Sequence, residues 1–444
     1  MTGNHMKYHV WTEGCQMNTA DSQRLASALE ALGYEYVEKP ENADVVVLNT
    51  CMVRQSAEDR ALGRLGSLKP AKEKNPNMII GLMGCMVGYK DPKPLKKKLR
   101  WVDVFAPPSD PKPIVDYVVS RMIADETLSS DAADFEWDPG RIILPKPQQN
   151  TAVLAYVPVV YGCSHACSYC IIPYKRGAER SRDPEEILAH ARSLAAQGVK
   201  EITLLGQIID RYGLDHPDYP KLPELLRRIH DIEGVERIRF LTSHPNWMTD
   251  ELLKTVAELP RVMSHIEVPA QSGSDKVLET MRRGYTDAQY RDLIAKIRDT
   301  IPNVSIGTDI IVGFCGETEE QFEETVRHLS DLKLNVVHLA RYSPRTGTLS
   351  ERTMADDVSE EEKWRRFRVI QKLQEDIGGE YHEKLVGQTV KVLFEEKKHR
   401  RWLGRTENMD LVFADSDEDL TGKLLPVKIT WSSPWTMGGD LVGD

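Results

Sequence analysis

Three cysteines lie close together in one short segment, at Cys163, Cys167 and Cys170 in the run YGCSHACSYCIIP. The spacing C-x3-C-x2-C supplies three soft thiolates from one loop, which suits an iron–sulfur cluster and leaves one iron of a 4Fe-4S cube open to a small molecule. Structural zinc, the simpler alternative, takes four protein ligands, and His165 is poorly placed to be the fourth. A disulfide set is weaker still, because three neighbouring thiols cannot all pair. The spacing therefore predicts an iron–sulfur cluster.

A second set of cysteines, Cys15, Cys51 and Cys85, recurs at intervals of 36 and 34 residues. Each follows an apolar extended run (KYHVWTEG, DVVVLNT and MIIGLMG) and precedes a helical pattern, which predicts repeated strand–helix units in a parallel sheet. The carboxyl ends of parallel strands meet along one edge, where ligands bind. The pattern predicts a second three-thiolate site, and the alternative is three buried structural cysteines.

Apolar runs and helical patterns divide the chain into domains. We expect an α/β fold with a doubly wound parallel domain over 7–125, which would carry the second cysteine set. The acidic, aperiodic segment DETLSSDAADFEWDPG then opens a linker over 126–150. The six starting residues MTGNHM are left out of the fold prediction.

The region 151–383 contains six apolar strand patterns that alternate with helical ones, which predicts a partial (β/α)6 barrel. Asp183-Pro184 and Thr249-Asp250 are helix-start signals, and a long amphipathic helix over about 360–385 closes the region. The cysteine loop follows the first strand, at the end of the barrel where sites lie. From 384 to 444 short strands predict a small all-β barrel of OB-like size.

Composition narrows the class of protein. The chain has 444 residues, a formal net charge of −10 and seven cysteines. We find no signal-peptide pattern and no apolar run long enough to span a membrane, and the odd number of cysteines fits a reducing compartment, so we expect a cytoplasmic protein without a membrane partner. The acidic balance creates no global attraction for nucleic acid, so a polyanion would need a local basic patch.

Several motifs then carry a resemblance that runs nearly end to end. They are GCQMN with DSQRL, NTCMVRQSAEDRALGRLG, GCMVG, the cysteine loop extended to YGCSHACSYCIIPYKRGAERSR, TSHP, PAQSGS and YSPRTGT. With these motifs the chain resembles the methylthiotransferases of the radical S-adenosylmethionine (SAM) superfamily, and is most similar to their MiaB-type tRNA-modifying branch. The C-terminal region resembles the TRAM domain, an RNA-binding barrel.

The resemblance implies two 4Fe-4S clusters and SAM as cofactors. Cys163, Cys167 and Cys170 would hold the cluster that cleaves SAM to a 5′-deoxyadenosyl radical. The second cysteine set would hold an auxiliary cluster whose open iron carries the sulfur to be donated. The implied reaction inserts a methylthio group at C2 of N6-isopentenyladenosine beside the anticodon. The implied partners are the tRNA anticodon stem-loop and an electron donor such as flavodoxin or ferredoxin, and we expect a monomer.

Further side chains are candidates for SAM or substrate contacts. Polar residues at the ends of consecutive barrel strands are more often part of a site than structural. Tyr169 resembles the superfamily's aromatic residue near adenine, although ordinary loop packing would also explain it. Arg283 and Asp309 could equally pair with local partners. The full set of candidates is Tyr169, Gln207, Ser243, Gln271, Ser272, Arg283 and Asp309.

Basic residues followed by Trp402 in the C-terminal region combine phosphate-binding charge with a stacking surface. The candidates for RNA contacts are Lys397, Lys398, Arg400, Arg401 and Arg405. The alternative is a solvated hairpin, and the likeness to TRAM favours RNA.

Two other functions remain open from the sequence. One is a sibling methylthiotransferase that acts on threonylcarbamoyladenosine in tRNA or on a ribosomal-protein aspartate. The other is a non-catalytic iron–sulfur protein that binds RNA. Because both cysteine sets are complete, the enzyme is favoured over the binding protein.

Overall fold

The computed structural model describes residues 6–52, 55–90, 92–124 and 138–443. The chain divides into two compact units, each assembled from separate stretches of sequence. The first comprises residues 1–150, 155–164 and 171–197, and the second comprises 151–154, 165–170 and 198–444. The N-terminal residues excluded above and the first half of the expected linker lie largely outside the described residues, as do Val53 and Arg54 of the second cysteine motif.

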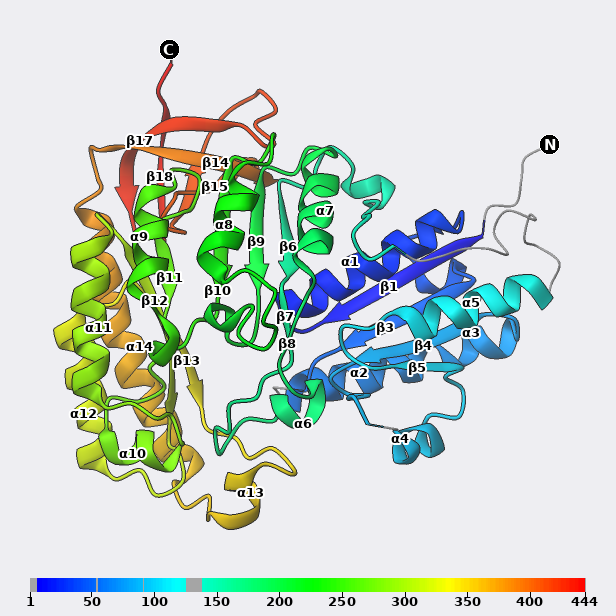
Figure 1. Cartoon of the computed structure of the whole chain (residues 1–444), viewed down its shortest axis with the longest axis horizontal. Coiled ribbons are helices and arrows are strands. Elements are labelled where there is room, and N and C mark those ends of the chain that lie inside the picture. The colour runs from blue at the N-terminus through cyan, green and yellow to red at the C-terminus, as the bar shows by residue number, and fades with distance from the viewer. Residues whose placement is uncertain (1–5, 53–54, 91, 125–137, 444) are drawn as a thin grey trace. The chain divides into compact units, whose positions relative to one another are not determined.

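A parallel sheet of five strands forms the centre of the first unit, in the order β2-β1-β3-β4-β5 (Figure 1). Its strands are β1 (Lys7–Glu13), β2 (Glu35–Tyr36), β3 (Val45–Thr50), β4 (Ile79–Gly84) and β5 (Val104–Ala106). Its helices are α1 (Gln16–Ala31), the 3-10 helix η1 (Pro40–Asn42), α2 (Gln55–Ser67), α3 (Lys69–Lys74), α4 (Lys93–Lys98) and α5 (Lys112–Ala124).

Alternating side chains of β3 place a hydrophobic core on each face of this sheet. Val45 and Val47 pack with residues of α1 and α5, such as Leu25 and Ile114. Val46 and Leu48 enter a second core with Leu65 of α2 and other residues. Because strand side chains point alternately to opposite faces, a fully apolar strand needs helices on both sides. The doubly wound arrangement expected for this domain is confirmed.

The rest of the first unit contains η3 (Lys146–Gln148), most of β6 (Leu154–Pro158), β7 (Val160–Tyr161), α6 (Ile172–Arg176), β8 (Arg180–Ser181) and α7 (Pro184–Ala195). The described half of the expected linker is packed there. Ile142 and Leu144 are buried, and Gln197 donates to the carbonyl of Ile142 and accepts from the backbone N–H of Leu144. Asp183 caps α7 by accepting from two backbone N–H groups, as the sequence predicts.

The second unit contains the other barrel strands, β9 (Glu201–Leu205), β10 (Arg237–Leu241), β11 (His265–Glu267), β12 (Ser305–Val312) and β13 (Val336–Arg341). In this unit β9 pairs with β10 in parallel, β11, β12 and β13 form a parallel sheet in that order, and a parallel bridge from Ile238 to Val262 extends the pairing beyond β10. The helices are η4 (Ile209–Arg211), α8 (Leu222–His230), η5 (Pro245–Trp247), α9 (Asp250–Glu258), α10 (Asp275–Thr280), α11 (Asp287–Thr300), α12 (Glu319–Leu332), α13 (Leu349–Thr353) and α14 (Glu360–Glu383). These strands and helices match the expected partial barrel.

The C-terminal strands close into a barrel in the order β14-β15-β16-β18-β17. They are β14 (Thr389–Lys398), β15 (Arg401–Arg405), β16 (Leu411–Ala414), β17 (Leu424–Ser432) and β18 (Thr436–Leu441). Two buried arginines of β10 reach this barrel: Arg237 donates to the carbonyl of Arg405, and Arg239 donates to that of Thr406 while pairing with Glu201 at 3.0 Å. The small barrel is therefore fixed within the second unit by buried charged groups.

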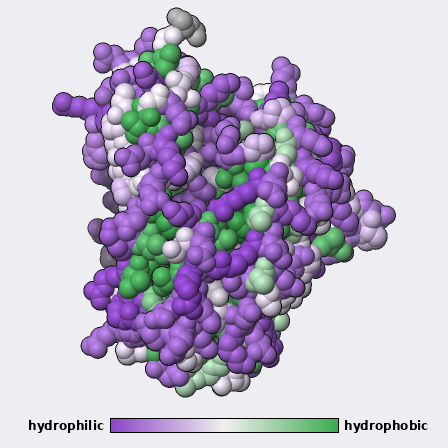
Figure 2. Space-filling model, turned by 90° about the vertical axis from the view of Figure 1, so that its left-hand side faces the viewer, coloured by the Kyte–Doolittle hydropathy of each residue, from purple (hydrophilic) through white to green (hydrophobic). Residues whose placement is uncertain are grey.

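Figure 2 shows the face of the second unit that carries α11, α12 and α14, where hydrophilic residues predominate and apolar residues gather in separate areas. Trp364 and Val369 of α14 are among the exposed large hydrophobic residues of this unit. No helix in the described part of the chain is long and apolar enough to cross a membrane.

Candidate functional site

The N-terminal cysteines follow three adjacent strands that end together. Pairing in β1, β3 and β4 aligns Glu13 with Thr50, and Thr50 with Gly84. Cys51 and Cys85 come directly after these ends, and Cys15 comes two residues after its strand. Neighbouring strands lie about 4.8 Å apart. Parallel pairing therefore brings cysteines separated by more than thirty residues to one edge of the sheet, as the sequence predicts.

Electrostatic interactions among these thiols support their proximity. Burial raises the pKa of Cys85 to about 11; Arg176 lowers it, and Cys51 and Cys15 raise it further. Within the described residues, no three His, Cys, Asp or Glu side chains are placed to hold one metal ion. A 4Fe-4S cube does not need that closeness, because each thiolate binds a different iron. The soft donor set at this sheet edge fits a cluster bound through three irons.

Asparagines hold the turn that carries the first cysteine. Asn18 Oδ1 accepts from the backbone N–H of Cys15 at 3.4 Å and from its thiol at 3.3 Å. The Asn18 amide donates to Asn49 Oδ1 at 2.8 Å and to the carbonyl of Thr50. Gly14 precedes this turn at φ +151°, and a Cβ there would lie 2.8 Å from Cys51 Cβ. Cys15 and Cys51 are thus positioned by one shared network.

A buried arginine lies beside this cysteine set. Arg176 Nη1, at the end of α6, donates to Ser109 Oγ at 2.9 Å and lies 3.7 Å from Asp21 Oδ2. Burial lowers the pKa of Arg176, but the facing Cys85, Asp21 and Cys15 raise it above its ordinary value overall. The guanidinium is therefore a fixed positive charge next to the thiols.

In the loop C-x3-C-x2-C, the three cysteines are held by different backbone contacts. Gly162 precedes the loop at φ +67°, where a Cβ would lie 2.1 Å from the carbonyl oxygen of Ala178. The backbone N–H of Cys163 donates to the carbonyl of Gly177 at 3.1 Å. Cys170 N–H donates to the carbonyl of Cys167 at 3.3 Å, so the last two cysteines share a tight turn.

The predicted residue Arg283 contacts this turn directly. Its Nη1 donates to Cys167 Sγ at 3.3 Å, its Nη2 to the carbonyl of Pro269 at 3.1 Å, and its Nε to Tyr285 Oη at 3.0 Å. Arg283 is buried, and its pKa is raised because Tyr169, Tyr285 and Cys167 outweigh the effect of burial. These contacts place Arg283 beside the sulfur of Cys167.

Two histidines form an aromatic group in the second unit. The rings of His165 and His244 lie 4.7 Å apart in an edge-to-face arrangement, and Trp247 lies 4.7 Å from His244. Burial, with Arg283, His165 and Arg211 nearby, lowers the pKa of His244 to about 2, so this imidazole is neutral. Its Nδ1 accepts from the backbone N–H of Asn246, and its buried Nε2 has no hydrogen-bond partner among the described atoms.

The polar residues predicted at strand ends differ in the hydrogen bonds that they form. Ser243, after β10, is buried with an Oγ that has no hydrogen-bond partner among the described atoms. Ser272 Oγ is engaged with Thr325 Oγ1 of α12 at 3.1 Å. Gln271 adopts φ +73° and its backbone N–H donates to the carbonyl of Asp309. Gln207 follows β9 and is partly exposed. Ser243 is therefore better placed than Ser272 to offer a free hydroxyl.

Asp309 and Tyr169 lie in enclosed surroundings. Burial raises the pKa of Asp309 to about 6, with His338 and Arg283 opposing this shift and Glu267 adding to it. Tyr169 packs edge-on against Phe314 at 6.2 Å in a cluster with Tyr342. Burial raises the pKa of Tyr169 as well. Cys315 is buried in the same cluster, which agrees with an apolar packing role for that cysteine.

The basic residues of the C-terminal barrel lie on the hairpin formed by β14 and β15. Most have acidic neighbours. Lys398 pairs with Glu396 at 2.7 Å, Arg401 with Asp415 at 3.1 Å, and Arg405 binds both oxygens of Glu395 at 2.6 and 2.7 Å.

Two of these basic residues differ from the paired ones. Lys397 donates to the carbonyl of Ser416, and its ammonium lies 5.6 Å from the Trp402 ring centre. Arg400 occupies the turn at φ +76° and is exposed. Among the described residues, Lys397 and Arg400 therefore form no ion pair, unlike Lys398, Arg401 and Arg405.

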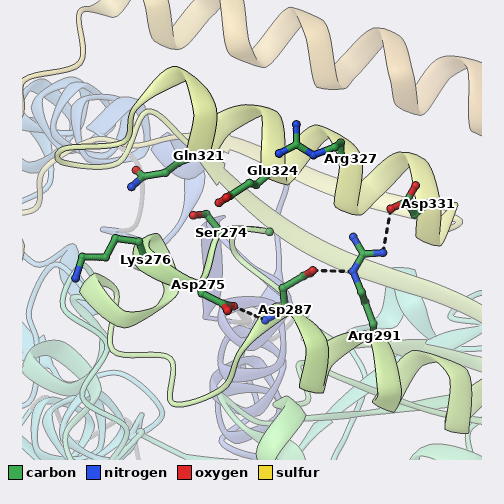
Figure 3. Close-up of a pocket in the computed structure, with 10 residues that line it drawn as sticks. Ser274, Asp275, Lys276, Asp287, Arg291, Gln321, Glu324, Arg327 and Asp331 are labelled. Atoms are coloured by element: carbon green, nitrogen blue, oxygen red, sulfur yellow. Dashed lines mark hydrogen bonds and ion pairs between the residues drawn. The ribbon is translucent and has the colours of Figure 1, made fainter.

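A charged cavity of about 470 Å³ lies among α10, α11 and α12. Figure 3 shows Arg291 between Asp287 and Asp331, with Nε 2.6 Å from one carboxylate and Nη1 3.0 Å from the other. Positive and negative side chains alternate around this cavity, and neither cysteine set contributes to its lining. It is separate from the candidate site.

Sequence reasoning missed several residues that the structure places at the cysteines. They are Asn18, Asp21, Asn49, Ser109, Arg176 and His244. Most of them stand inside or beside the quoted motifs, such as GCQMN, NTC, IIPYKRG and TSHP. The available signal was a polar residue within a cysteine motif, although its contacts depend on chain folding over long sequence distances.

Comparison with family models assigns three parts of the chain. Residues 7–106 match "Uncharacterized protein family UPF0004", residues 157–329 match "Radical SAM superfamily" and residues 383–442 match "TRAM domain". A solved structure of the radical SAM methyltransferase TsrM from Kitasatospora setae, with tryptophan and a SAM analog bound, is similar in fold. Its TM-score is 0.54 at 14% identity, over 76% of this chain and 73% of that one. At this identity the likeness shows the fold alone.

Curated relatives match nearly the whole chain. A tRNA-2-methylthio-N(6)-dimethylallyladenosine synthase from Roseiflexus sp. (strain RS-1) is 45% identical over 443 residues, which is 99% of this chain and 90% of that protein. The enzyme of the same name from Herpetosiphon aurantiacus is 43% identical, over 99% of this chain and 98% of that protein. With these identities along nearly its full length, the chain belongs to the tRNA-2-methylthio-N(6)-dimethylallyladenosine synthase family of radical SAM methylthiotransferases.

Proposed function

We propose that the protein inserts a methylthio group at C2 of N6-isopentenyladenosine in tRNA, with its two cysteine sets holding separate 4Fe-4S clusters. Cys163, Cys167 and Cys170 hold the cluster that binds SAM, and the N-terminal set holds the auxiliary cluster. The observation that carries this proposal is the presence of two complete three-cysteine sets in one chain. When bound, these clusters and SAM supply reductive cleavage of SAM and a coordinated sulfur for transfer.

Side chains around the loop cysteines serve to hold and orient. Arg283 Nη1 donates to Cys167 Sγ and so holds this sulfur in place within the loop. His244 stays neutral at physiological pH and offers its buried Nε2 to a polar group. The Ser243 hydroxyl is a second polar group available to a ligand. Tyr169, Gln207, Gln271, Ser272 and Asp309 complete the proposed set of cofactor contacts.

The domain boundaries proposed from the sequence are 7–125 for the auxiliary-cluster domain, 126–150 for the linker, 151–383 for the radical SAM domain and 384–444 for the TRAM domain. The closed five-stranded barrel supports the last of these. We propose that its basic hairpin contacts the anticodon stem-loop. Because one chain carries both cysteine sets, a monomer suffices for the reaction, with an electron donor of the flavodoxin or ferredoxin type.

Single cysteine variants test the proposed roles of the two cysteine sets. The reconstituted protein is incubated anaerobically with SAM, reductant and tRNA that carries N6-isopentenyladenosine, and 5′-deoxyadenosine and modified nucleosides are measured by mass spectrometry. Cys15→Ala should still form 5′-deoxyadenosine but no 2-methylthio product, whereas Cys163→Ala should form neither. Cys315→Ala, which lies outside both sets, is the matched control and should form both.

The same assay separates the alternatives. Equal loss of both products in the Cys15 and Cys163 variants would contradict the assigned roles. Failure of the wild-type protein to modify this tRNA, with activity only on a ribosomal-protein peptide or on threonylcarbamoyladenosine, would contradict the proposed substrate. Absence of 5′-deoxyadenosine from the reconstituted wild type would favour a binding protein without turnover.

A further inference from the structure

We infer that Arg176 is a positioning residue for the auxiliary cluster. The buried positive charge of this arginine makes the cluster easier to reduce. The inference rests on the proposed function, because it requires a cluster at the three N-terminal cysteines. It extends that function to a residue outside both cysteine sets, which stands six positions after Cys170 in the chain.

The position of the Arg176 guanidinium is fixed from one side. Its side chain is 2% exposed and that of Asp21 is 0% exposed, with Nη1 and Oδ2 3.7 Å apart. Ser109 links the two, since its Oγ accepts from Arg176 at 2.9 Å and donates to the Asp21 carboxylate at 3.1 Å. Arg24 donates to the carbonyl of Ser109 and holds that turn. This framework leaves the arginine little freedom to rotate away.

The other side of the guanidinium faces the cysteines. Arg176 interacts electrostatically with Cys85 and with Cys15. Its Nη2 is buried and donates to no acceptor with good geometry among the described atoms. A buried donor without an acceptor is costly, so a nearby anionic group would relieve that cost. Sulfide and thiolate sulfurs are acceptors of this kind.

The sign of the effect follows from charge. A 4Fe-4S cluster with thiolate ligands becomes more negative when it gains an electron, and hydrogen bonds to its sulfurs and nearby charges set its reduction potential. A fixed cation in a buried environment is weakly screened, so it stabilises the reduced cluster more than the oxidised one. Asp21 opposes part of this effect from the far side of the guanidinium.

The loop cysteines show the same arrangement, since the buried Arg283 donates to Cys167. Each cysteine set therefore has one thiol next to a buried arginine. Arg176 differs from Arg283 at Nη2. In Arg283 this group donates to the carbonyl of Pro269, whereas in Arg176 it has no acceptor among the described atoms.

The test isolates the auxiliary cluster by replacing Cys163, Cys167 and Cys170 with alanine in the full chain. After anaerobic reconstitution, iron content is measured and the cluster is titrated with reductant while its electron paramagnetic resonance signal is followed. Adding Arg176→Gln should lower the equilibrium constant for one-electron reduction at least tenfold, which corresponds to about 59 mV. Arg176→Lys keeps the charge and should shift it less than Arg176→Gln.

Arg182→Gln is the matched control. Arg182 is a buried arginine on the segment after α6 that donates to the carbonyl of Pro158, so its loss should leave the midpoint unchanged. If the Arg176→Gln protein binds four irons and has the same midpoint potential as the Arg182→Gln protein, the inference is overturned. If Arg176→Gln binds less iron, the midpoint potential is measured in Asp21→Asn instead, which removes the opposing negative charge. A more positive midpoint potential in this variant supports the inference, and an unchanged one overturns it. Failure of the background variant itself to bind four irons would instead contradict the proposed auxiliary cluster.

Discussion

At the scale of single residues, buried charges are placed next to thiols and next to one another. Arg176 lies beside Cys85, and Arg283 donates to Cys167. Neutral side chains complete these surroundings, since the pKa of His244 is lowered to about 2. Asp309 is the exception, because burial raises its pKa to about 6 and its charge depends on pH.

Asp309 should therefore make folding stability depend on pH. Its ordinary pKa of 3.8 applies to the unfolded chain, whereas the folded protein binds the proton up to about pH 6. Because the folded state holds that proton more tightly, the contribution of Asp309 to stability falls as pH rises from about 4 to about 6. Asp309→Asn should remove this part of the pH dependence, as measured by denaturant unfolding of the apoprotein. An unchanged difference between pH 4.5 and pH 6.5 in the variant would contradict the assignment.

At the scale of elements, the auxiliary site depends on strands that end in register. The turn between β1 and α1 brings Cys15 to Cys51, and it requires a glycine because Gly14 has φ +151° and no room for a Cβ. Gly33, after α1, also has a positive φ of +85°, but an added methyl group there would have nothing within 4 Å. A substitution at either glycine would strain the backbone, but only a substitution at Gly14 would also cause a steric conflict. Comparing the two positions therefore separates these effects.

Gly14→Ala should reduce iron binding by the N-terminal set, because the added methyl group would lie 2.5 Å from Asn18 Oδ1 and 2.8 Å from Cys51 Cβ. Gly33→Ala carries a comparable backbone cost of about 1 kcal/mol but should bind iron normally. The measurement is iron content of both variants in the chain that lacks the loop cysteines. Equal iron binding by the two would show that the close packing at Gly14 does not position the cysteines.

The elements also show what the sequence could and could not predict. Alternation of strand and helix patterns, together with cysteines after each strand, predicted the parallel sheet and the placement of its three cysteines at one edge. Arg176 could not be assigned in this way, because its partners Asp21, Cys85 and Ser109 are between 67 and 155 positions away in the sequence. The sequence of the β14–β15 hairpin also did not indicate that Arg405 forms an ion pair with Glu395.

At the scale of the whole molecule, an acidic protein with a net charge of −10 has a nucleic-acid substrate. Attraction must then come from local positive charge. Ion pairs at Lys398, Arg401 and Arg405 reduce that charge within the C-terminal barrel. Lys397 and Arg400 of the β14–β15 hairpin remain the strongest candidates for phosphate contacts.

Replacing both Lys397 and Arg400 with alanine should weaken tRNA binding and lessen its salt dependence. Each phosphate contact contributes about 0.7 to 0.9 to the slope of log affinity against log salt, so the double variant should lose up to about 1.8. Binding is measured across a salt series. Lys372→Ala on α14, where Lys372 pairs with Asp376, is the control and should keep the wild-type slope. An unchanged slope in the double variant would move the RNA contact elsewhere.

The assignment of one cluster to each cysteine set is tested most directly by iron content after anaerobic reconstitution. Three proteins are compared: the wild type and the two variants in which one cysteine set is replaced by alanine. Two independent 4Fe-4S clusters predict about eight irons per chain in the wild type and about four in each variant. A wild-type protein with four irons, or a variant that loses all of its iron with one cysteine set intact, would contradict the assignment of one cluster to each set.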